Sequence, residues 1–205
     1  MPVAPLPPDD PLQGLIKQLA RLPGLGQRSA RRIALHLLQH RSQIMQPLAA
    51  SLANAATEIK TCGICGNLGT TDPCHLCRDA TRDDSVICVV SGVADIWAIE
   101  RTRQYRGAYH VLGGVLSALD GVGPDDLTFT ALLGRATTGD IREVIIALAA
   151  TVDGQTTAHV ISDALNALPH PIKITRLAHG LPMGGELDYM DDGTIGLALA
   201  ARTKL

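Results

Sequence analysis

The chain has 205 residues, of which 46% are hydrophobic and 19% are charged. This length and composition are typical of a folded protein with a substantial core, and they exclude a disordered, highly charged tail. The net charge of −2 conceals an uneven distribution: residues 1–60 carry seven basic and three acidic side chains, whereas the rest carries 11 basic and 17 acidic ones. A basic head indicates contact with a polyanion, although a solvated helical surface would give the same balance.

The chain also lacks the features of several other protein classes. No apolar run approaches the roughly 18 residues of a membrane-spanning helix, and residues 1–11 are rich in proline without the pattern of a secretory signal. We therefore expect a cytoplasmic protein with no membrane partner. The five aromatic residues of the whole chain argue against a single-strand binder that stacks bases on aromatic side chains.

Apolar residues at helical spacing predict three helices in the first sixty residues, at about 12–22, 27–38 and 47–59. Proline and glycine break the first helix in the segment Leu22-Pro-Gly-Leu-Gly26. Glycines let the backbone approach a ligand closely, and the N–H groups that begin the next helix favour a phosphate.

Three arginines follow this turn on one side of the second helix. Such a unit contacts backbone phosphates and not bases, so its binding to nucleic acid should depend on salt and not on sequence. A hairpin whose glycines serve only the turn is the alternative. The candidate DNA-binding residues are Gly24, Gly26, Arg28, Arg31 and Arg32.

Four cysteines form two C-x-x-C knuckles, Cys62/Cys65 and Cys74/Cys77, separated by eight residues. Paired knuckles place four thiolates tetrahedrally around one ion, and zinc favours that geometry. Because all four positions are filled by protein, we expect one structural zinc ion per chain. Two disulfides and an iron–sulfur cluster are the alternatives. His75, inside the second knuckle, is expected to be a bystander.

The remainder of the chain alternates between strand and helix patterns, which predicts a mostly parallel sheet flanked by helices. Cys88, within the first strand, is interpreted as a small core residue, and His110 as a packed histidine. The expected strands are 86–90, 108–112, 143–148 and 172–176, and the expected helices are 93–101, 157–168 and 194–201.

Several segments, in one order along nearly the whole chain, resemble the RecR family of bacterial recombination mediator proteins. Besides the glycine turn and the four cysteines, they are Ile87-Cys-Val-Val90, Ala98-Ile-Glu-Arg101, Tyr105 to Gly114, Leu119 to Leu127 and Thr175 to Gly185. The resemblance implies an α+β multi-domain chain. Its expected parts are a helix–hairpin–helix DNA-binding head (1–60), a C4 zinc finger (61–80), an α/β Toprim domain (84–178) and a small C-terminal turn and helix (179–205).

The resemblance also implies a function in DNA repair without catalysis. Members of the family assemble as rings or clamps and work with RecO and RecF to load recombinase onto gapped DNA. The expected partners are therefore DNA, RecO- and RecF-type proteins, and further copies of the chain in a dimer or a tetramer ring.

A Toprim enzyme for phosphoryl transfer is the competing hypothesis. Such enzymes hold Mg²⁺ with several carboxylates, because this ion prefers hard oxygen ligands. In this chain Ser91 and Gln155 occupy two of the usually acidic positions, which leaves Asp153 as the remaining carboxylate. We therefore expect no catalytic residues and no enzyme activity. Asp95 follows Ser91 by four residues, and the sequence does not place its side chain.

Overall fold

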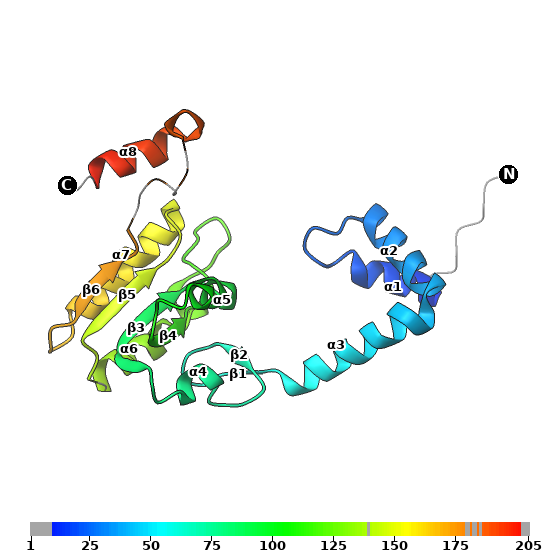
Figure 1. Cartoon of the computed structure of the whole chain (residues 1–205), viewed down its shortest axis with the longest axis horizontal. Helices are drawn as coiled ribbons and strands as arrows, with labels where there is room; N and C mark the ends of the chain where they lie inside the picture. Colours follow the sequence, from blue (N-terminus) through cyan, green and yellow to red (C-terminus); the bar gives the residue numbers. More distant parts are fainter. Residues whose placement is uncertain (1–9, 139, 179–180, 182–183, 185, 202–205) are drawn as a thin grey trace. The chain divides into compact units, whose positions relative to one another are not determined.

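The computed structural model describes residues 10–138, 140–178, 181, 184 and 186–201. The chain divides into two compact units between Ile59 and Lys60, and each is described by itself (Figure 1). The proline-rich start at 1–9 and part of the expected C-terminal element at 179–205 lie outside the described residues. None of the described helices is long and apolar enough to cross a membrane.

The first unit is helical throughout. Asp10 begins it as an N-cap, since its carboxylate accepts the backbone N–H of Leu12 at 2.8 Å. A π-helical turn joins the second and third helices, and such turns are rare in proteins. The elements are α1 (Pro11–Leu19), α2 (Gln27–Gln39), the π-helical turn η1 (Arg41–Met45) and α3 (Gln46–Glu58).

Helices α1 and α2 share a small apolar core formed by Ile16, Ala30 and Ala34, with Leu37 also buried. The small alanine side chains let the two helices approach closely. This side of α2 therefore packs inward, opposite the arginines. All residues of α3 are described, and none of them is buried.

The second unit begins with the cysteine segment and continues into a four-stranded sheet. A short hairpin of β1 (Lys60–Thr61) and β2 (Leu68–Gly69) and the single-turn α4 (His75–Arg78) carry the cysteines. All neighbouring pairs in the sheet are parallel, in the order β4-β3-β5-β6. Its strands are β3 (Asp83–Val90), β4 (Gly107–Val111), β5 (Glu143–Ala147) and β6 (Lys173–Arg176).

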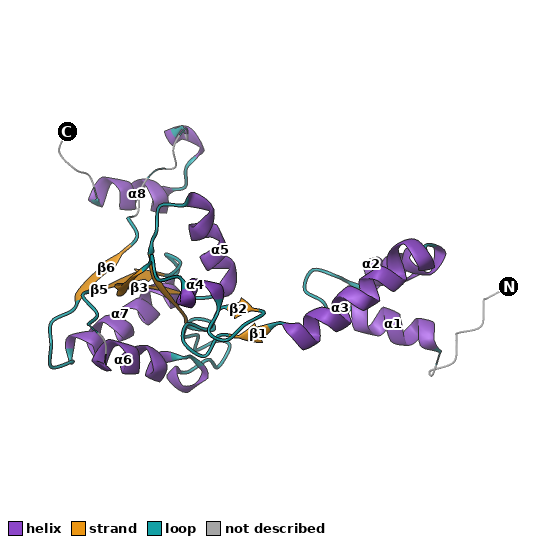
Figure 2. Cartoon of the chain, turned by 60° about the horizontal axis from the view of Figure 1, so that its bottom comes forward, coloured by secondary structure: helices purple, strands orange, loops and turns teal. Residues whose placement is uncertain are grey.

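Helices cover both faces of this sheet, as the alternating pattern predicts (Figure 2). On one face, Ile96 of α5 (Val93–Thr102) packs with Cys88 and the four-cysteine segment. On the other face lie α6 (Phe129–Thr138) and α7 (Val152–Asn166). Beyond the sheet the described chain contains α8 (Asp192–Ala200), near the expected 194–201.

Helix α6 and the start of helix α7 differ from the prediction. Helix α6 was not predicted, because its sequence contains a glycine and three threonines, which are poor helix formers. Helix α7 begins at Val152 and not at 157, because Thr151 caps it by accepting the Gly154 N–H at 3.2 Å. The early start places Asp153 and Gln155 in the first turn of α7.

Candidate zinc centre and nucleic-acid interface

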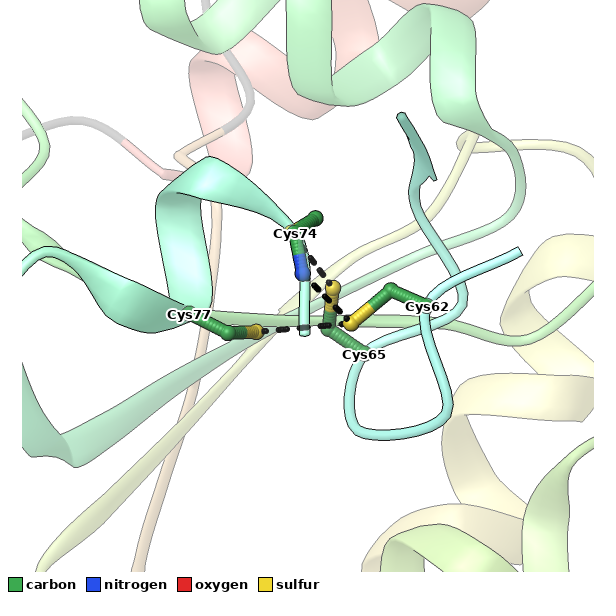
Figure 3. A group of neighbouring side chains, drawn as sticks. All are labelled: Cys62, Cys65, Cys74 and Cys77. Carbon is green, nitrogen blue, oxygen red and sulfur yellow. Dashed lines mark hydrogen bonds between the residues drawn. The ribbon is translucent and has the colours of Figure 1, made fainter. Parts of the chain in front are cut away.

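The side chains of Cys62, Cys65, Cys74 and Cys77 gather around one point (Figure 3). All four sulfur atoms lie within 4.8 Å of one another, with 3.9 Å between Cys62 and Cys77 and 3.6 Å between Cys65 and Cys74. A tetrahedron with zinc–sulfur bonds of about 2.3 Å has edges of about 3.8 Å. The spacing of the sulfurs therefore fits a single zinc ion.

Backbone hydrogen bonds shape the two knuckles around this centre. In the first knuckle the Asn67 N–H lies 3.4 Å from the Cys65 sulfur, and the Cys62 N–H donates to the Asn67 carbonyl at 2.7 Å. In the second, the Cys74 N–H lies 3.3 Å from the Cys62 sulfur. Gly66 has φ of +77°, which favours glycine at this turn. N–H donors stabilise thiolates, so both knuckles favour a bound cation.

Asn67 is a contributor that the sequence analysis missed. Its side chain is 1% exposed, and its Nδ2 lies 3.8 Å from the Cys74 sulfur. It therefore connects the two knuckles directly. Its position two residues after Cys65 could have predicted the contact of its backbone N–H with the Cys65 sulfur. No local sequence feature predicts that its side chain turns to the opposite knuckle.

The thiols of this cluster compete for ionisation. Hydrogen bonding with Cys77 lowers the pKa of Cys65 to about 5, whereas hydrogen bonding with Cys65, followed by burial, raises the pKa of Cys77. Burial raises the pKa of Cys74. The Cys65 thiolate forms readily whereas Cys74 and Cys77 resist ionisation, and a cation among the sulfurs would favour their ionised forms. The donor set suits a zinc ion held for structure, since protein groups fill all four positions.

The cysteine segment is anchored on the sheet. The Val111 N–H of β4 donates to the Cys65 carbonyl at 2.8 Å, and Tyr109 belongs to the same buried cluster. Three of the cysteines are buried and Cys77 is half-buried. His75 is exposed and lies outside the converging group, which agrees with its interpretation as a bystander.

The glycine turn lies between α1 and α2 and leads directly into α2. Gly24 has φ of +76°, a region that favours glycine, and the Leu25 N–H closes the turn on the Leu22 carbonyl at 3.1 Å. Gly26 is the N-cap of α2, and no described side chain caps that terminus. A Cβ atom at Gly26 would meet no described atom within 4 Å. The backbone here is open to a ligand, and packing alone does not require this glycine.

The arginines of α2 follow the turn on the exposed side of the helix. Arg28, Arg31 and Arg32 are all exposed, and none of them forms an ion pair within the described residues. Leu35, on the same side, is 45% exposed. The structure thus places the five candidate DNA-binding residues along one turn and the two helical turns that follow it.

The carboxyl edge of the sheet holds the positions where Toprim enzymes place acidic ligands. The Ser91 hydroxyl donates to Asp95 Oδ2 at 2.7 Å, and the Gly92 N–H donates to the same oxygen at 2.9 Å. Asp95 therefore lies beside Ser91, where it caps the N-terminus of α5. This carboxylate serves the start of the helix.

The residues at the start of α7 likewise have local roles. Gln155 Nε2 lies 3.3 Å from the Ala150 carbonyl, and a Cβ atom at Gly154 would overlap the Ala149 carbonyl, so glycine is required there. Among the described residues, the groups of three or more His, Cys, Asp or Glu side chains that converge on one point comprise just the four cysteines. Asp153 and Asp95 are not part of such a group.

Comparisons with known proteins agree along the chain. Models of the RecR family match residues 12–56 (the RecR helix-hairpin-helix), 59–79 (the RecR four-cysteine zinc finger domain) and 180–203 (the RecR C-terminal part), and a Toprim domain model matches 85–178. The Recombination protein RecR of Rhizobium rhizogenes is 56% identical over 95% of this chain and 96% of its own length. That of Beijerinckia indica is 57% identical over 94% of each. This chain belongs to the RecR family.

Membership of the RecR family confirms the resemblance drawn from the sequence and the expected fold class. It supports a role in recombinational repair, and the prediction that the chain is not an enzyme agrees with it. The zinc-finger match covers all four converging cysteines. In this RecR-family chain, the glycine turn and its arginines fall within the helix-hairpin-helix match.

Proposed function

We propose that this chain is a non-catalytic mediator of recombinational DNA repair, acting in the cytoplasm at the nucleoid. It binds DNA as an oligomeric clamp and acts with RecO- and RecF-type proteins to load recombinase onto gapped DNA. The observation that carries the proposal is the row of exposed arginines that follows an open glycine turn in a RecR-family chain. The proposed parts are the head (1–60), the zinc finger (61–80), the Toprim domain (84–178) and the C-terminal element (179–205).

The charge of the first unit supports DNA as its ligand. Its described residues contain two carboxylates, and Asp10 is engaged in capping α1 while Glu58 ends α3. Arginine forks suit phosphate oxygens. The open N-terminus of α2 adds backbone N–H donors for a further phosphate. These contacts go to the backbone of DNA and give no preference for sequence.

The exposed apolar side of the third helix supports self-association. Leu48 and Leu52 lie one helical turn apart on α3 and are 42% and 63% exposed. Ile44 in the preceding turn η1 and Ile59 at the C-cap of α3 are 37% and 43% exposed. Large apolar side chains gathered on one side of an amphipathic helix mark an interaction surface. A second copy of the chain is the proposed partner of this surface. Joining several basic heads raises the overall affinity for one DNA molecule, because binding of the first head raises the effective concentration of the others.

The carboxyl edge of the sheet supports docking of a basic protein partner. The segments that follow β3, β4 and β5 at this edge are 91–95, 113–126 and 149–155, and they contain no lysine, arginine or histidine. Leu119, at the tip of the second segment, is 99% exposed. An exposed leucine in segments that carry five aspartates favours a basic protein partner, and we assign this role to the RecO-type partner. The acidic residues are Asp95, Asp120, Asp125, Asp126 and Asp153.

The double change Arg28→Ala and Arg32→Ala tests the DNA site. Each lost phosphate contact lowers the dependence of log affinity on log salt by about 0.9 on duplex DNA. We expect weaker binding on all sequences alike and a salt slope reduced by about 2 for each subunit engaged. Fluorescence anisotropy at several salt concentrations measures both quantities.

The matched control removes two exposed arginines from the second unit, Arg101→Ala and Arg106→Ala. It carries the same change of charge and should bind DNA nearly as the unmodified protein does. Circular dichroism and zinc content establish that both variants fold. A folded, zinc-containing Arg28/Arg32 variant with unchanged affinity and slope would refute the assignment of DNA binding to α2.

A further inference from the structure

Two histidines lie at the end of α2 that is remote from the glycine turn. The rings of His36 and His40 are in contact, with centroids 4.3 Å apart and planes inclined by 38°. His36 follows Arg28 and Arg32 at successive intervals of four residues, so these three side chains form one strip along the helix. Each step of four residues advances about 6 Å along the axis. The histidine pair therefore extends the row of arginines.

The hydrogen bond made by His40 determines which of its nitrogens titrates. Nδ1 lies 2.9 Å from the His36 carbonyl, and because a carbonyl accepts, Nδ1 carries a hydrogen in both charge states. Nε2 is then the nitrogen that gains or loses a proton. In the neutral ring it presents a lone pair, which repels a phosphate oxygen. In the charged ring it presents an N–H, which donates to one.

The charged groups on the elements around this pair are mostly basic. Arg31 and Arg32 lie on α2 itself, Arg41 begins η1, and Lys17 lies on α1. The acidic group on these described elements is the carboxylate of Asp10, which caps α1. The same surroundings disfavour a metal cation, so the pair suits a phosphate better than a metal ion.

The C-terminal end of α2 repels a phosphate less than a free helix C-terminus would, because its carbonyl groups have hydrogen-bond donors. The His40 N–H donates to the carbonyls of His36 and Leu37 at 3.1 and 3.2 Å. The His40 carbonyl in turn accepts the N–H groups of Ile44 and Met45 at 2.9 and 3.2 Å. Because the chain continues into η1, these carbonyls are satisfied, and their repulsion of an anion is reduced.

We propose that His36 and His40 form a second, proton-dependent phosphate-contact site on α2, which takes the phosphodiester backbone of DNA. The inference rests on the proposed DNA binding by this helix. Arg28 and Arg32 contact the backbone at any physiological pH, whereas the histidines contact the next stretch of it when they are charged. Since histidine changes charge between pH 5 and 8, DNA binding takes up protons in that range.

The affinity of the full-length, zinc-loaded protein for a duplex of fixed sequence, measured against salt at about pH 6 and about pH 8, tests the proposal. We expect the salt slope to be steeper at the lower pH by about 1 to 2 for each subunit engaged, since each added phosphate contact contributes about 0.9. The variant His36→Gln/His40→Gln should show the same slope at both pH values. Its affinity at the higher pH should equal that of the unmodified protein.

Matched variants separate this proposal from the proposed function. Arg28→Ala/Arg32→Ala should bind more weakly at both pH values and keep the change of slope with pH. If that variant binds DNA as the unmodified protein does, the DNA site on α2 fails. If it weakens binding while the double histidine variant keeps the full pH dependence, the histidine site alone is overturned. His75→Gln, in the other unit, should keep the pH dependence, and its loss there would also overturn the assignment.

Discussion

The guanidinium group of Arg82 and the carboxylate of Glu100 form a short ion pair, with 2.6 Å between Nη2 and Oε2. The Arg82 side chain is 5% exposed, and its Nη1 also donates to the Gly107 carbonyl at 3.1 Å. The Tyr109 hydroxyl donates to the other oxygen of Glu100 at 2.7 Å. Burial alone would raise the pKa of Glu100, but the hydrogen bonds from Arg82 and Tyr109 outweigh it and lower that pKa. This network joins the segment after the zinc knuckles to α5 and β4.

Replacing Arg82 should destabilise the second unit substantially. Arg82→Met leaves Glu100 without its ionic partner. Loss of one member of a fully buried pair costs about 3–5 kcal/mol in free energy of unfolding, and the cost is smaller here because the Glu100 side chain is 29% exposed. Adding Glu100→Gln should recover part of that loss in chemical denaturation. The exposed pair of Arg142 and Asp83, at 72% and 47% exposure, provides the control, since Arg142→Met should cost less than about 1 kcal/mol. Equal effects of the two methionine variants would contradict the prediction.

The cysteine cluster should hold one zinc ion per chain, and Cys74→Ser should release it. Cys74 is fully buried and its backbone N–H also lies against the Cys62 sulfur, so its loss disturbs both knuckles. Because the free energy of zinc binding is free energy of folding, thermal unfolding of the second unit should begin at a lower temperature. Elemental analysis and calorimetry measure both effects. Cys88→Ala, outside the cluster, should keep its zinc, and zinc retained by Cys74→Ser would refute the ligand set.

Charge placed on the third helix should disrupt assembly. Leu48→Glu/Leu52→Glu introduces two carboxylates into the exposed apolar side of α3, where burial against a second copy would be costly. Light scattering should show a smaller species, and DNA affinity should fall because the heads are no longer joined. Leu119→Glu, at another exposed leucine, should leave the oligomer intact. An unchanged mass of the double variant would place the subunit contact elsewhere.

Acid should weaken the fold partly through His110. This side chain is 2% exposed, its Nε2 lies 2.9 Å from the Thr128 hydroxyl, and burial together with Arg135 lowers its pKa to about 4. The unfolded chain takes up this proton near pH 6.5, so the stabilisation is complete above pH 6.5 and is lost as the pH falls through about 4. It amounts to roughly 3 kcal/mol.

The variant His110→Gln isolates this contribution. Its free energy of unfolding should fall less steeply between about pH 6.5 and 4 than that of the unmodified protein. Loss of zinc in acid affects both proteins, so the difference between their slopes belongs to His110. Parallel slopes would show that His110 is not the responsible group.

Incubation with Mg²⁺ or Mn²⁺ and single- or double-stranded DNA should yield no cleavage, relaxation or primer synthesis. Phosphoryl transfer by a bound metal requires several converging oxygen ligands, and Asp95 is engaged with Ser91 and the start of α5. Gel electrophoresis of the DNA products provides the measurement. Reproducible turnover that disappears in Asp153→Ala would contradict the mediator function.

The features that the sequence determined by itself are those made by residues close together in the chain. Four cysteines within sixteen residues need only two local turns to converge, so their spacing predicted the cluster. The glycine turn and the inward side of α2 follow from residues within one or two helical turns. The parallel sheet could be predicted from the alternation of strand and helix patterns, because the hydrophobic pattern of each element shows which of its residues are buried.

Tertiary structure decided the contacts between residues far apart in the chain. Arg82 meets Glu100 across 18 positions, and His110 meets Thr128 across the same separation. Asn67 reaches the opposite knuckle because a backbone turn orients it there. Helix α6, with its weak intrinsic propensity, forms because Leu132 and Ala136 pack against the sheet. Such interactions depend on which distant segments of the chain become neighbours in the fold. Hydrophobic burial between elements determines that arrangement, and local preference does not.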